Sequence, residues 1–378
     1  MKINKQLPDD QMELNCLLKE LKDISVRGLS KMFDPEKQLF CYRMRKNGDD
    51  ISREGHSVRY TIITLLGLHR LESHGEKIPF HIQSQLKNLV KNAVQLDNMG
   101  DVGLLLWLCA IANAELINKL LADVDLESSL IRFRDAQLGK TTELAWFLTG
   151  LAYVAMAPIP NPPGIKDLTL KVYELIRSNY GNKGIFGHQR KNTLEGATRG
   201  RIGSFADQVY PIYGFSKFAK AYNHPEALKI AVECGKAICQ HQGALGQWWW
   251  HYDANTGNAV GQYPVYSVHQ EGMAPMALFA LGEASGLDFS SNIYKGLEWI
   301  MGNNELDFNL IDSENKMIWR NFYKKKYKMH FEVILSLMRS SLVKGGSKDL
   351  KVLFECRPYC FGWLLYAFAE KIKMGNSQ

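Results

Sequence analysis

The chain has 378 residues, of which 46% are hydrophobic, and a formal net charge of +7 at pH 7. This length allows one large hydrophobic core, and we expect a single domain over residues 1–378. No window approaches the ~18 uninterrupted apolar residues of a membrane span, and the N-terminus MKINKQLPDDQMELN lacks the apolar run of a signal peptide. Seven cysteines at irregular spacings indicate reduced thiols, so we expect a cytoplasmic protein without a membrane span.

The modest positive charge does not indicate nucleic-acid binding. The basic run KKKYK (324–328) is not accompanied by any recognisable nucleic-acid motif. The sequence also lacks a Walker loop, a dinucleotide-binding fingerprint after a strand, and an HExxH motif. We therefore expect no nucleic-acid partner, no cofactor and no metal, and the oligomeric state stays unknown.

Apolar residues recur at spacings of three and four through most of the chain, which is typical of helices. In chain order, this spacing predicts helices over 10–32, 57–74, 82–97, 101–122, 126–137, 141–156, 166–180, 204–222, 225–242, 269–285, 289–302, 328–343 and 358–373. Strand-like alternation is limited to short runs such as FCYRMR (40–45) and MIWRNF (317–322), which are compatible with small hairpins. An all-α fold is predicted.

Six helical segments share one plan, in which a polar start leads into an apolar helix rich in small residues. They begin at SVRYT (57), DVGLL (101), TTELA (141), DQVYP (207), HQEGM (269) and RPYCF (357). More amphipathic helices, such as PEALKIAVECGKAICQH (225–241), separate them. A solenoid would have shorter, more regular repeats, and a plain bundle would not explain the recurrent polar starts.

This alternation predicts an (α/α)6 toroid of six helical hairpins, with a ring of apolar helices inside a ring of amphipathic ones. Glycine and alanine in the inner helices would let their backbones approach closely. We expect the inner helices to begin near residues 57, 101, 142, 207, 269 and 358 and to run parallel. Their N-termini would then meet at one mouth of the toroid, together with a few short strands in long loops.

Residues 199–231, RGRIGSFADQVYPIYGFSKFAKAYNHPEALKIA, resemble the helical hairpin of six-hairpin carbohydrate enzymes. This group includes the unsaturated glucuronyl hydrolases and the N-acylglucosamine 2-epimerases, in which an inner helix turns at a His-Pro or Asp-Pro corner into an outer helix. RPYCFGWLLYAFAE (357–370) similarly resembles the last inner helix of the epimerases, although their histidine before the helix is missing. The resemblance implies the hairpin architecture and does not transfer any catalytic residue.

Four long irregular segments lead toward inner helices and would gather at the same mouth. They cover residues 38–56, 181–206, 243–268 and 303–327. Loops of this length in a compact domain are usually functional. The third of them contains most of the stretch WWWHYDANTGNAVGQYPVYSVHQ (248–270), which concentrates aromatic and titratable side chains. We predict that this aromatic loop lines a cleft.

Aromatic rings bury the C–H faces of sugars well, while neighbouring polar groups bind the hydroxyls. The predicted substrate-binding residues are Trp248, Trp249, Trp250, Tyr252, Asp253, Tyr263, Tyr266 and Gln270 in the aromatic loop, Tyr210 and Tyr213 in an inner helix, and Arg59 and Arg357 at the mouth. At least one of the three adjacent tryptophans should fill the gap between hairpins instead. The arginines and the helix N-termini favour an anionic ligand, such as a uronic acid.

Three residues are candidate catalytic groups. Asp207 starts an inner helix and is either an N-cap or a general acid or base, and we expect its aromatic neighbours to raise its pKa. His269 and His251 titrate near neutrality when unperturbed and could move a proton, although each is also compatible with a packed, hydrogen-bonded histidine. Glu271 and Asp253 are the next acids to consider.

These features predict a carbohydrate-active enzyme that performs acid–base chemistry on a small or oligomeric anionic saccharide. Glycosidic hydrolysis is favoured over epimerisation or β-elimination. A first alternative is an enzyme resembling the terpenoid cyclases, in which the aromatic faces would stabilise a carbocation formed from a prenyl substrate. A second is a saccharide-binding toroid without catalytic activity.

Overall fold

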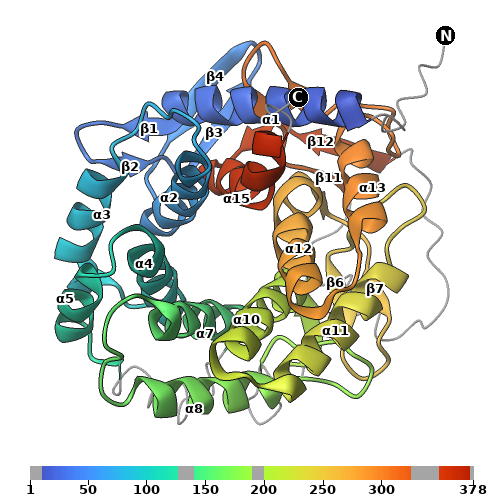
Figure 1. Cartoon of the computed structure of the whole chain (residues 1–378). Coiled ribbons are helices and arrows are strands. Elements are labelled where there is room, and N and C mark those ends of the chain that lie inside the picture. Colours follow the sequence, from blue (N-terminus) through green and yellow to red (C-terminus); the bar gives the residue numbers. More distant parts are fainter. Residues whose placement is uncertain (1–10, 127–139, 190–199, 325–348, 375–378) are drawn as a thin grey trace.

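The computed structural model describes residues 11–126, 140–189, 200–324 and 349–374, which form a closed double ring of helices (Figure 1). The inner ring contains α2 (Val58–Ser73), α4 (Met99–Ala112), α7 (Thr141–Met156), α10 (Ala206–Tyr222), the π-helical turn η2 (His269–Met273) with α12 (Ala274–Ser285), and α15 (Pro358–Met374). Successive inner helices pack against each other, and α15 closes the ring against α2. All six predicted starts are confirmed to within two residues.

An outer helix lies between successive inner helices along the chain. The outer ring contains α1 (Gln11–Met32), α3 (Ile82–Lys91), α5 (Leu116–Asp123), α8 (Ile165–Arg177), α11 (Pro225–Gln240) and α13 (Ser290–Ile300). The (α/α)6 toroid predicted from the sequence is therefore confirmed. The expectation of one helix over 101–122 is wrong, because Asn113 leaves the helical conformation and separates inner α4 from outer α5. The helices expected at 126–137 and 328–343 fall outside the described ranges, apart from Leu126.

Side-chain contacts show that the inner helices run parallel. At their N-terminal ends, Arg59 of α2 bonds Asp101 of α4, and Thr142 of α7 bonds Asp207 of α10. At the opposite end of the ring, the Tyr153 hydroxyl of α7 lies 2.7 Å from that of Tyr213 on α10. Because neighbouring helices meet start to start and end to end, their N-termini share one mouth, as predicted.

Glycines allow the inner helices to approach at backbone distance. A Cβ atom on Gly150 of α7 would lie 2.2 Å from the carbonyl oxygen of Gly103 on α4. A Cβ atom on Gly67 of α2 would lie 2.1 Å from the carbonyl oxygen of Gly362 on α15. Real side chains do not tolerate such distances, so these two helix pairs require glycine at the crossing points.

Aromatic side chains fill the axis of the ring. Trp107 of α4 stacks on Tyr153 and Tyr213, with ring centroids 5.2 and 4.9 Å apart; Trp107 and Tyr213 are buried, and Tyr153 is partly exposed. The hydroxyl of Tyr366 on α15 lies 2.7 Å from that of Tyr213 and 3.2 Å from that of Tyr153. We call these four residues the axial plug. The opening between the ribbons in Figure 1 is therefore packed with side chains at this level.

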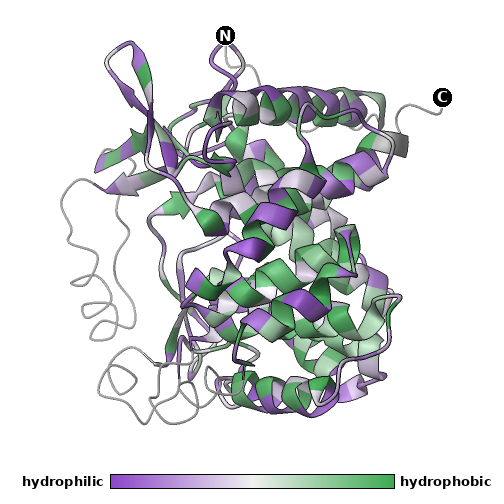
Figure 2. Cartoon of the chain, turned by 90° about the vertical axis from the view of Figure 1, so that its left-hand side faces the viewer, coloured by the Kyte–Doolittle hydropathy of each residue, from purple (hydrophilic) through white to green (hydrophobic). Residues whose placement is uncertain are grey.

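The strands gather at one end of the helical ring, on the left in Figure 2. Three small sheets join separate loops there: β13 (Glu355–Cys356) with β3 (Arg43–Asn47) and β4 (Asp50–Glu54); β12 (Leu350–Leu353) with β11 (Asn321–Lys324) and β8 (Val265–Tyr266); and β5 (Ile202–Ser204) with β6 (His251–Asp253) and β7 (Ala259–Gly261). Two further hairpins pair β1 (Phe33–Asp34) with β2 (Leu39–Phe40), and β9 (Ile311–Asp312) with β10 (Met317–Ile318). The predicted strands in the long loops are thus confirmed, and their cross-pairing holds the loops of the mouth together.

In the described ranges, no helix has the length and apolar character needed to cross a membrane.

Candidate functional site at the N-terminal mouth

Three arginines converge on one buried carboxylate beside the start of α15. Glu355 Oε1 accepts hydrogen bonds from Arg320 (2.7 Å) and Arg357 (2.6 Å), and its Oε2 accepts one from Arg43 (2.8 Å). Arg43 also bonds Glu54 at 2.6 Å. Three guanidinium groups thus face two carboxylates, which leaves an excess positive charge in this arginine cluster. Such an arrangement favours an incoming anion, and guanidinium groups bind carboxylates with defined geometry.

Aromatic rings flank the arginine cluster. The guanidinium of Arg357 lies 4.5 Å from the ring centroid of Tyr42, and it donates a 2.7 Å hydrogen bond to the Tyr60 hydroxyl. Tyr60 packs in turn against Tyr359, with ring centroids 4.6 Å apart. Tyr42, Tyr60 and Tyr359 are all partly exposed, so their rings are available to a ligand. The combination of flat apolar faces with fixed cations suits a sugar that carries an acidic group.

A second cluster lies at the starts of three inner helices, α2, α4 and α7, and contains two partly exposed acids. Arg59 on α2 holds Asp101 on α4 with two hydrogen bonds, of 2.5 and 3.1 Å, and its guanidinium lies 5.2 Å from the ring centroid of Trp146. Burial alone would lower the pKa of Arg59, but the bonds to Asp101 and the nearby charge of Glu143 raise it. Glu143 lies in the first turn of α7 and makes no hydrogen bond to any side chain in the described ranges. Asp101 and Glu143 therefore place two carboxyl groups at the mouth around one arginine.

Asp207 is saturated with hydrogen-bond donors. Its Oδ1 accepts from the backbone N–H and the hydroxyl of Thr142 (3.2 and 2.7 Å), and its Oδ2 accepts from the backbone and hydroxyl of Ser204 (both 2.8 Å) and bonds His188 Nδ1 (2.9 Å). Burial would raise its pKa, but His188 and these donors lower it below the usual value. The expected upward shift is wrong. The side chain is also fully buried, so it joins α7, α10 and the loop before α10 as an ionised structural carboxylate.

The two candidate histidines are buried. Burial lowers the pKa of His269 to about 3, so the imidazole is neutral at pH 7 and the expected titration near neutrality is wrong. Its ring stacks on Trp250 with centroids 5.7 Å apart and an interplanar angle of 8°. His251 lies on β6, where its ring packs against that of Trp250 with centroids 5.3 Å apart. These contacts give both histidines a packing role behind the mouth.

Glu271 is a buried carboxyl in the π-helical turn η2. Burial raises its pKa to about 8, while the Ser267 hydroxyl partly opposes this shift. If Glu271 were ionised, its charge would raise the pKa of Cys360, which is in the first turn of α15. The Glu271 side chain is therefore mostly protonated at pH 7. π-helical turns are frequent at functional sites, and this one lies in the first turn of an inner helix.

The three consecutive tryptophans lie in different environments. Trp248 is fully buried and packs against Phe205, so it fills the gap between hairpins that was expected for one of the three. Trp249 packs edge-on against Tyr263, with centroids 6.2 Å apart. Trp250 packs on Tyr266, with centroids 4.6 Å apart, and is partly exposed. Arg320 also lies over Tyr266, at 5.1 Å, so Trp250 and Tyr266 belong to the same wall of the mouth as the arginine cluster.

The remaining predicted binding residues divide between the mouth and the interior. Tyr210 lies buried near the floor of the mouth, where its hydroxyl accepts a 3.0 Å hydrogen bond from Trp363. Tyr213 belongs to the axial plug, and Tyr252 is fully buried, so a direct contact of either with substrate is not supported. Asp253 caps a tight turn through the backbone of Asn255, at 2.9 Å. Gln270 is likewise buried, and its side chain donates to the carbonyl of Tyr266 at 3.1 Å.

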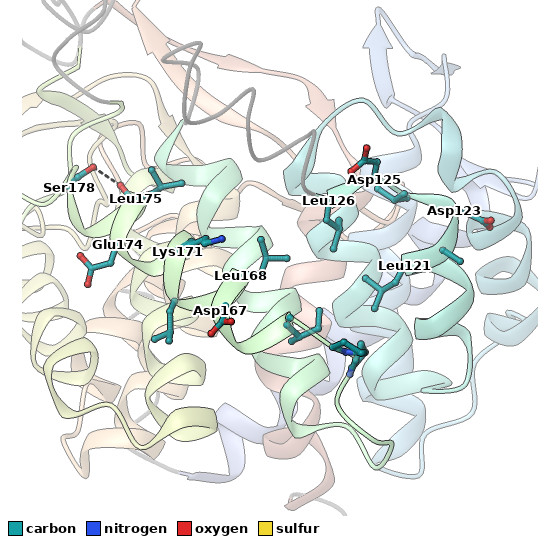
Figure 3. A pocket seen from close by; sticks show the side chains of 17 residues that line it. Leu121, Asp123, Asp125, Leu126, Asp167, Leu168, Lys171, Glu174, Leu175 and Ser178 are labelled. Carbon is teal, nitrogen blue, oxygen red and sulfur yellow. Dashed lines mark hydrogen bonds between the residues drawn. The ribbon is translucent and has the colours of Figure 1, made fainter.

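A large pocket lies on the outer wall of the toroid and not at the mouth. It has a volume of about 1520 Å³ and lies between α5 and α8, with Leu121 and Leu126 facing Leu168 and Lys171 (Figure 3). The prediction that the aromatic loop lines a cleft at the mouth is not tested by this pocket and stays a prediction. The described lining of the pocket includes Asp123, Asp125, Asp167 and Glu174 and no aromatic ring, so it offers few of the surfaces that bind sugars. We place the candidate site at the mouth on chemical grounds.

Several mouth residues did not emerge from the sequence as site residues. They are Asp101, Glu143, Arg43, Glu355, Tyr42, Tyr60 and Tyr359. Asp101 and Glu143 do lie in the polar starts of two inner helices, which is a signal that could have identified them. The arginine cluster instead draws on β3, β13 and the residue before β11, and no local pattern relates these segments. In the described ranges, no group of three or more His, Cys, Asp or Glu side chains could hold a metal ion.

Fold and mouth together define a parallel (α/α)6 toroid with an arginine- and tyrosine-rich opening. Solved structures with this fold include an unsaturated glucuronyl hydrolase specific for heparin, with 14% identity, a TM-score of 0.59, and coverage of 96% of this chain and 98% of that one. They also include an unsaturated glucuronyl hydrolase from Bacillus sp. GL1 (13% identity, TM-score 0.56, coverage 93% and 94%) and an Asp→Asn variant of the enzyme from Streptococcus agalactiae (10%, 0.61, 98% and 94%). The resemblance to six-hairpin carbohydrate enzymes is therefore confirmed at the level of the fold. No family model and no curated protein matches the sequence.

Proposed function

We propose that the chain is a glycoside hydrolase that acts on an anionic, uronate-type saccharide at the N-terminal mouth. One observation carries the proposal: the arginine cluster with its tyrosine faces is linked through Tyr60 and Arg59 to two partly exposed carboxyl groups, Asp101, which bonds Arg59, and Glu143, whose charge acts on Arg59. Tyr60 links the two clusters, because it follows Arg59 in the chain and accepts a hydrogen bond from Arg357. The structural neighbours, which are named as glucuronyl hydrolases, support a saccharide substrate.

The acid group of the sugar would bind to Arg320 and Arg357, which are oriented by their shared bonds to Glu355. The sugar ring would pack on the partly exposed faces of Tyr60, Tyr359 or Trp250. This mode of binding uses the excess positive charge of the arginine cluster, and it predicts weak binding of a neutral sugar of the same shape.

The two accessible acids have different environments, which suggests different roles. Asp101 is held by Arg59 at both oxygens and would act as the base that takes a proton from water. Glu143 is not bonded to another side chain in the described ranges and would donate a proton to the leaving oxygen. The water oxygen forms the new bond to the anomeric carbon as the glycosidic C–O bond breaks. One proton of the water passes to Asp101, and the leaving oxygen takes the proton of Glu143.

The test is turnover of uronate-terminated oligosaccharides, with products detected by mass. Asp101→Asn and Glu143→Gln should each lower kcat by about 100-fold or more, while Asp167→Asn on the exposed face of α8 should leave it unchanged. Arg320→Gln should raise KM for the acidic substrate and reduce its preference over a carboxyl-reduced analogue. Full activity of both acid variants would refute the assigned roles. Binding without turnover by the wild type would support a saccharide-binding protein, and products from prenyl diphosphates alone would support a terpenoid cyclase.

A further inference from the structure

Two cations lie at the opposite end of the ring, next to the axial plug. Arg70 is in the last turn of α2, and its guanidinium lies 4.6 Å from the ring centroid of Tyr366. Lys217 on α10 places its ammonium 5.4 Å from the ring centroid of Tyr213. Both side chains therefore contact the rings that carry the hydroxyl triangle of the plug, and they approach the axis rather than the outer surface.

The described residues provide one carboxylate within ion-pair distance of any of the cations Arg70, Lys217 and Lys220. Glu283 pairs with Lys217 at 3.2 Å and with Lys220 at 3.0 Å. Arg70 has no carboxylate within ion-pair distance in the described ranges. Burial would lower the pKa of Arg70, but its tyrosine neighbours raise it, so the guanidinium remains charged. Three cations thus share one acid.

Helix geometry explains only part of this arrangement. Cations in a last turn complement the partial negative charge of a helix C-terminus, and this accounts for Lys220, whose side chain is 61% exposed. The side chain of Lys217 is only 10% exposed and shares its counter-ion Glu283 with Lys220, while Arg70 is partly buried and has no carboxylate at ion-pair distance in the described ranges. Partly burying a charge without a counter-ion of its own is costly, so an anion from solution would stabilise Arg70 and add to the single acid that serves the two lysines.

A small pocket opens beside these groups. It has a volume of about 260 Å³ and is lined by Tyr153, Lys217 and Lys220 together with Ile111, Met156 and Pro158. Arg70 is not part of the lining, but its guanidinium lies over the ring of Tyr366, whose hydroxyl lies 3.2 Å from that of the lining residue Tyr153. The volume is slightly below the ~300 Å³ at which sites for drug-sized ligands begin, so a compact ligand fits best.

We propose that this C-terminal end of the toroid binds a small organic oxyanion. Its carboxylate or phosphate group contacts Lys217, Arg70 and the Tyr153 hydroxyl, and its apolar part packs on Ile111 and Met156. The axial plug separates this site from the N-terminal mouth. The proposal does not depend on the function assigned to the mouth.

The test compares the melting temperature in chloride, inorganic phosphate and butyrate at equal ionic strength. Phosphate or butyrate should raise the melting temperature of the wild type by about 3 °C at one hundred times the Kd. The two anions distinguish a phosphate site from a carboxylate site that also uses the apolar wall. Lys217→Gln and Arg70→Gln should abolish this rise. Lys229→Gln, on the exposed face of α11, and Arg320→Gln, at the mouth, should retain it.

Three results would overturn the proposal. One is the absence of any rise beyond that in chloride, and another is a full rise in both Lys217→Gln and Arg70→Gln. The third is loss of the rise in Arg320→Gln, which would place the anion at the N-terminal mouth. If Arg70→Gln does not fold, the melting temperatures of Lys217→Gln alone test the proposal. The Lys217 side chain lies at the edge of the axial plug, so its replacement should leave the fold intact.

Discussion

Replacement of Asp207 by asparagine tests whether this buried carboxylate holds the mouth together. Thr142 supplies two donors to Oδ1, and Ser204 with His188 supplies three to Oδ2. An asparagine presents an NH2 group to one of these sides. The hydroxyls there can rotate and accept, but the backbone N–H of Thr142 or of Ser204 then loses its acceptor.

The expected cost follows from these contacts. One buried backbone N–H without a partner costs about 1–3 kcal/mol, and a hydrogen bond to a charged group contributes about 1.5–3 kcal/mol. We therefore expect Asp207→Asn to lower the free energy of unfolding by about 3 kcal/mol. The folded variant should keep most of its turnover, because a carboxylate whose pKa is lowered does not donate protons at neutral pH.

Urea unfolding, monitored by tryptophan fluorescence, measures the loss in the free energy of unfolding. Asp101→Asn is the matched control. Asp101 likewise lies in the first turn of an inner helix, α4, but has only Arg59 as a side-chain partner, so we expect a loss of about 1 kcal/mol. The native pKa of Asp207 lies below its unfolded value. Its contribution is therefore present above that unfolded value and is lost as the pH falls through the native one. A wild-type urea midpoint combined with lost turnover would refute the structural role and restore Asp207 as a catalytic acid.

Glu271→Gln should remove a dependence of stability on pH. The native pKa of Glu271, about 8, exceeds its unfolded value near 4.3. The free energy of unfolding of the wild type therefore falls by about 1.4 kcal/mol for each pH unit as the pH rises from the unfolded pKa to the native one. Equal slopes for variant and wild type in urea unfolding at pH 5, 6.5 and 8 would contradict this. Trp248→Ala should cost about 3–5 kcal/mol because the ring is fully buried, whereas Trp250→Ala should mainly weaken saccharide binding in titration calorimetry; the reverse pattern would exchange their roles. Gly150→Ala should destabilise the α4–α7 contact by about 3 kcal/mol, and an unchanged melting temperature would show that the two backbones can separate.

The sequence predicted the ring because its signal is local. Apolar spacing and recurrent polar starts are properties of single segments, and parallel packing follows once six of them close. The direction of the pKa shift of Asp207 could not be predicted from such local patterns. Its aromatic neighbours are visible in the sequence, but its donors come from Thr142 and His188, on other segments of the chain.

The residues of the candidate site were even harder to predict from local sequence patterns. Arg357 was identified because it directly precedes an inner helix, whereas its partners Arg43 and Arg320 reach Glu355 only through strand pairing across the mouth. His269 was given a proton-transfer role from its ordinary titration range, but burial lowers its pKa far below that range. Tertiary burial and long-range pairing decide these properties, and neither has a periodic signature.

The axial plug determines how a polymer could be handled at the mouth. Because Trp107 and three tyrosines fill the axis, a long saccharide cannot thread through the ring, and only a chain end can reach the floor near Tyr210. Under the proposed function, a released sugar would have to leave by the opening through which the chain entered. The shortened chain or the sugar would then have to depart before the next chain end can bind, so exit would compete directly with entry and accumulating product would slow the proposed hydrolysis.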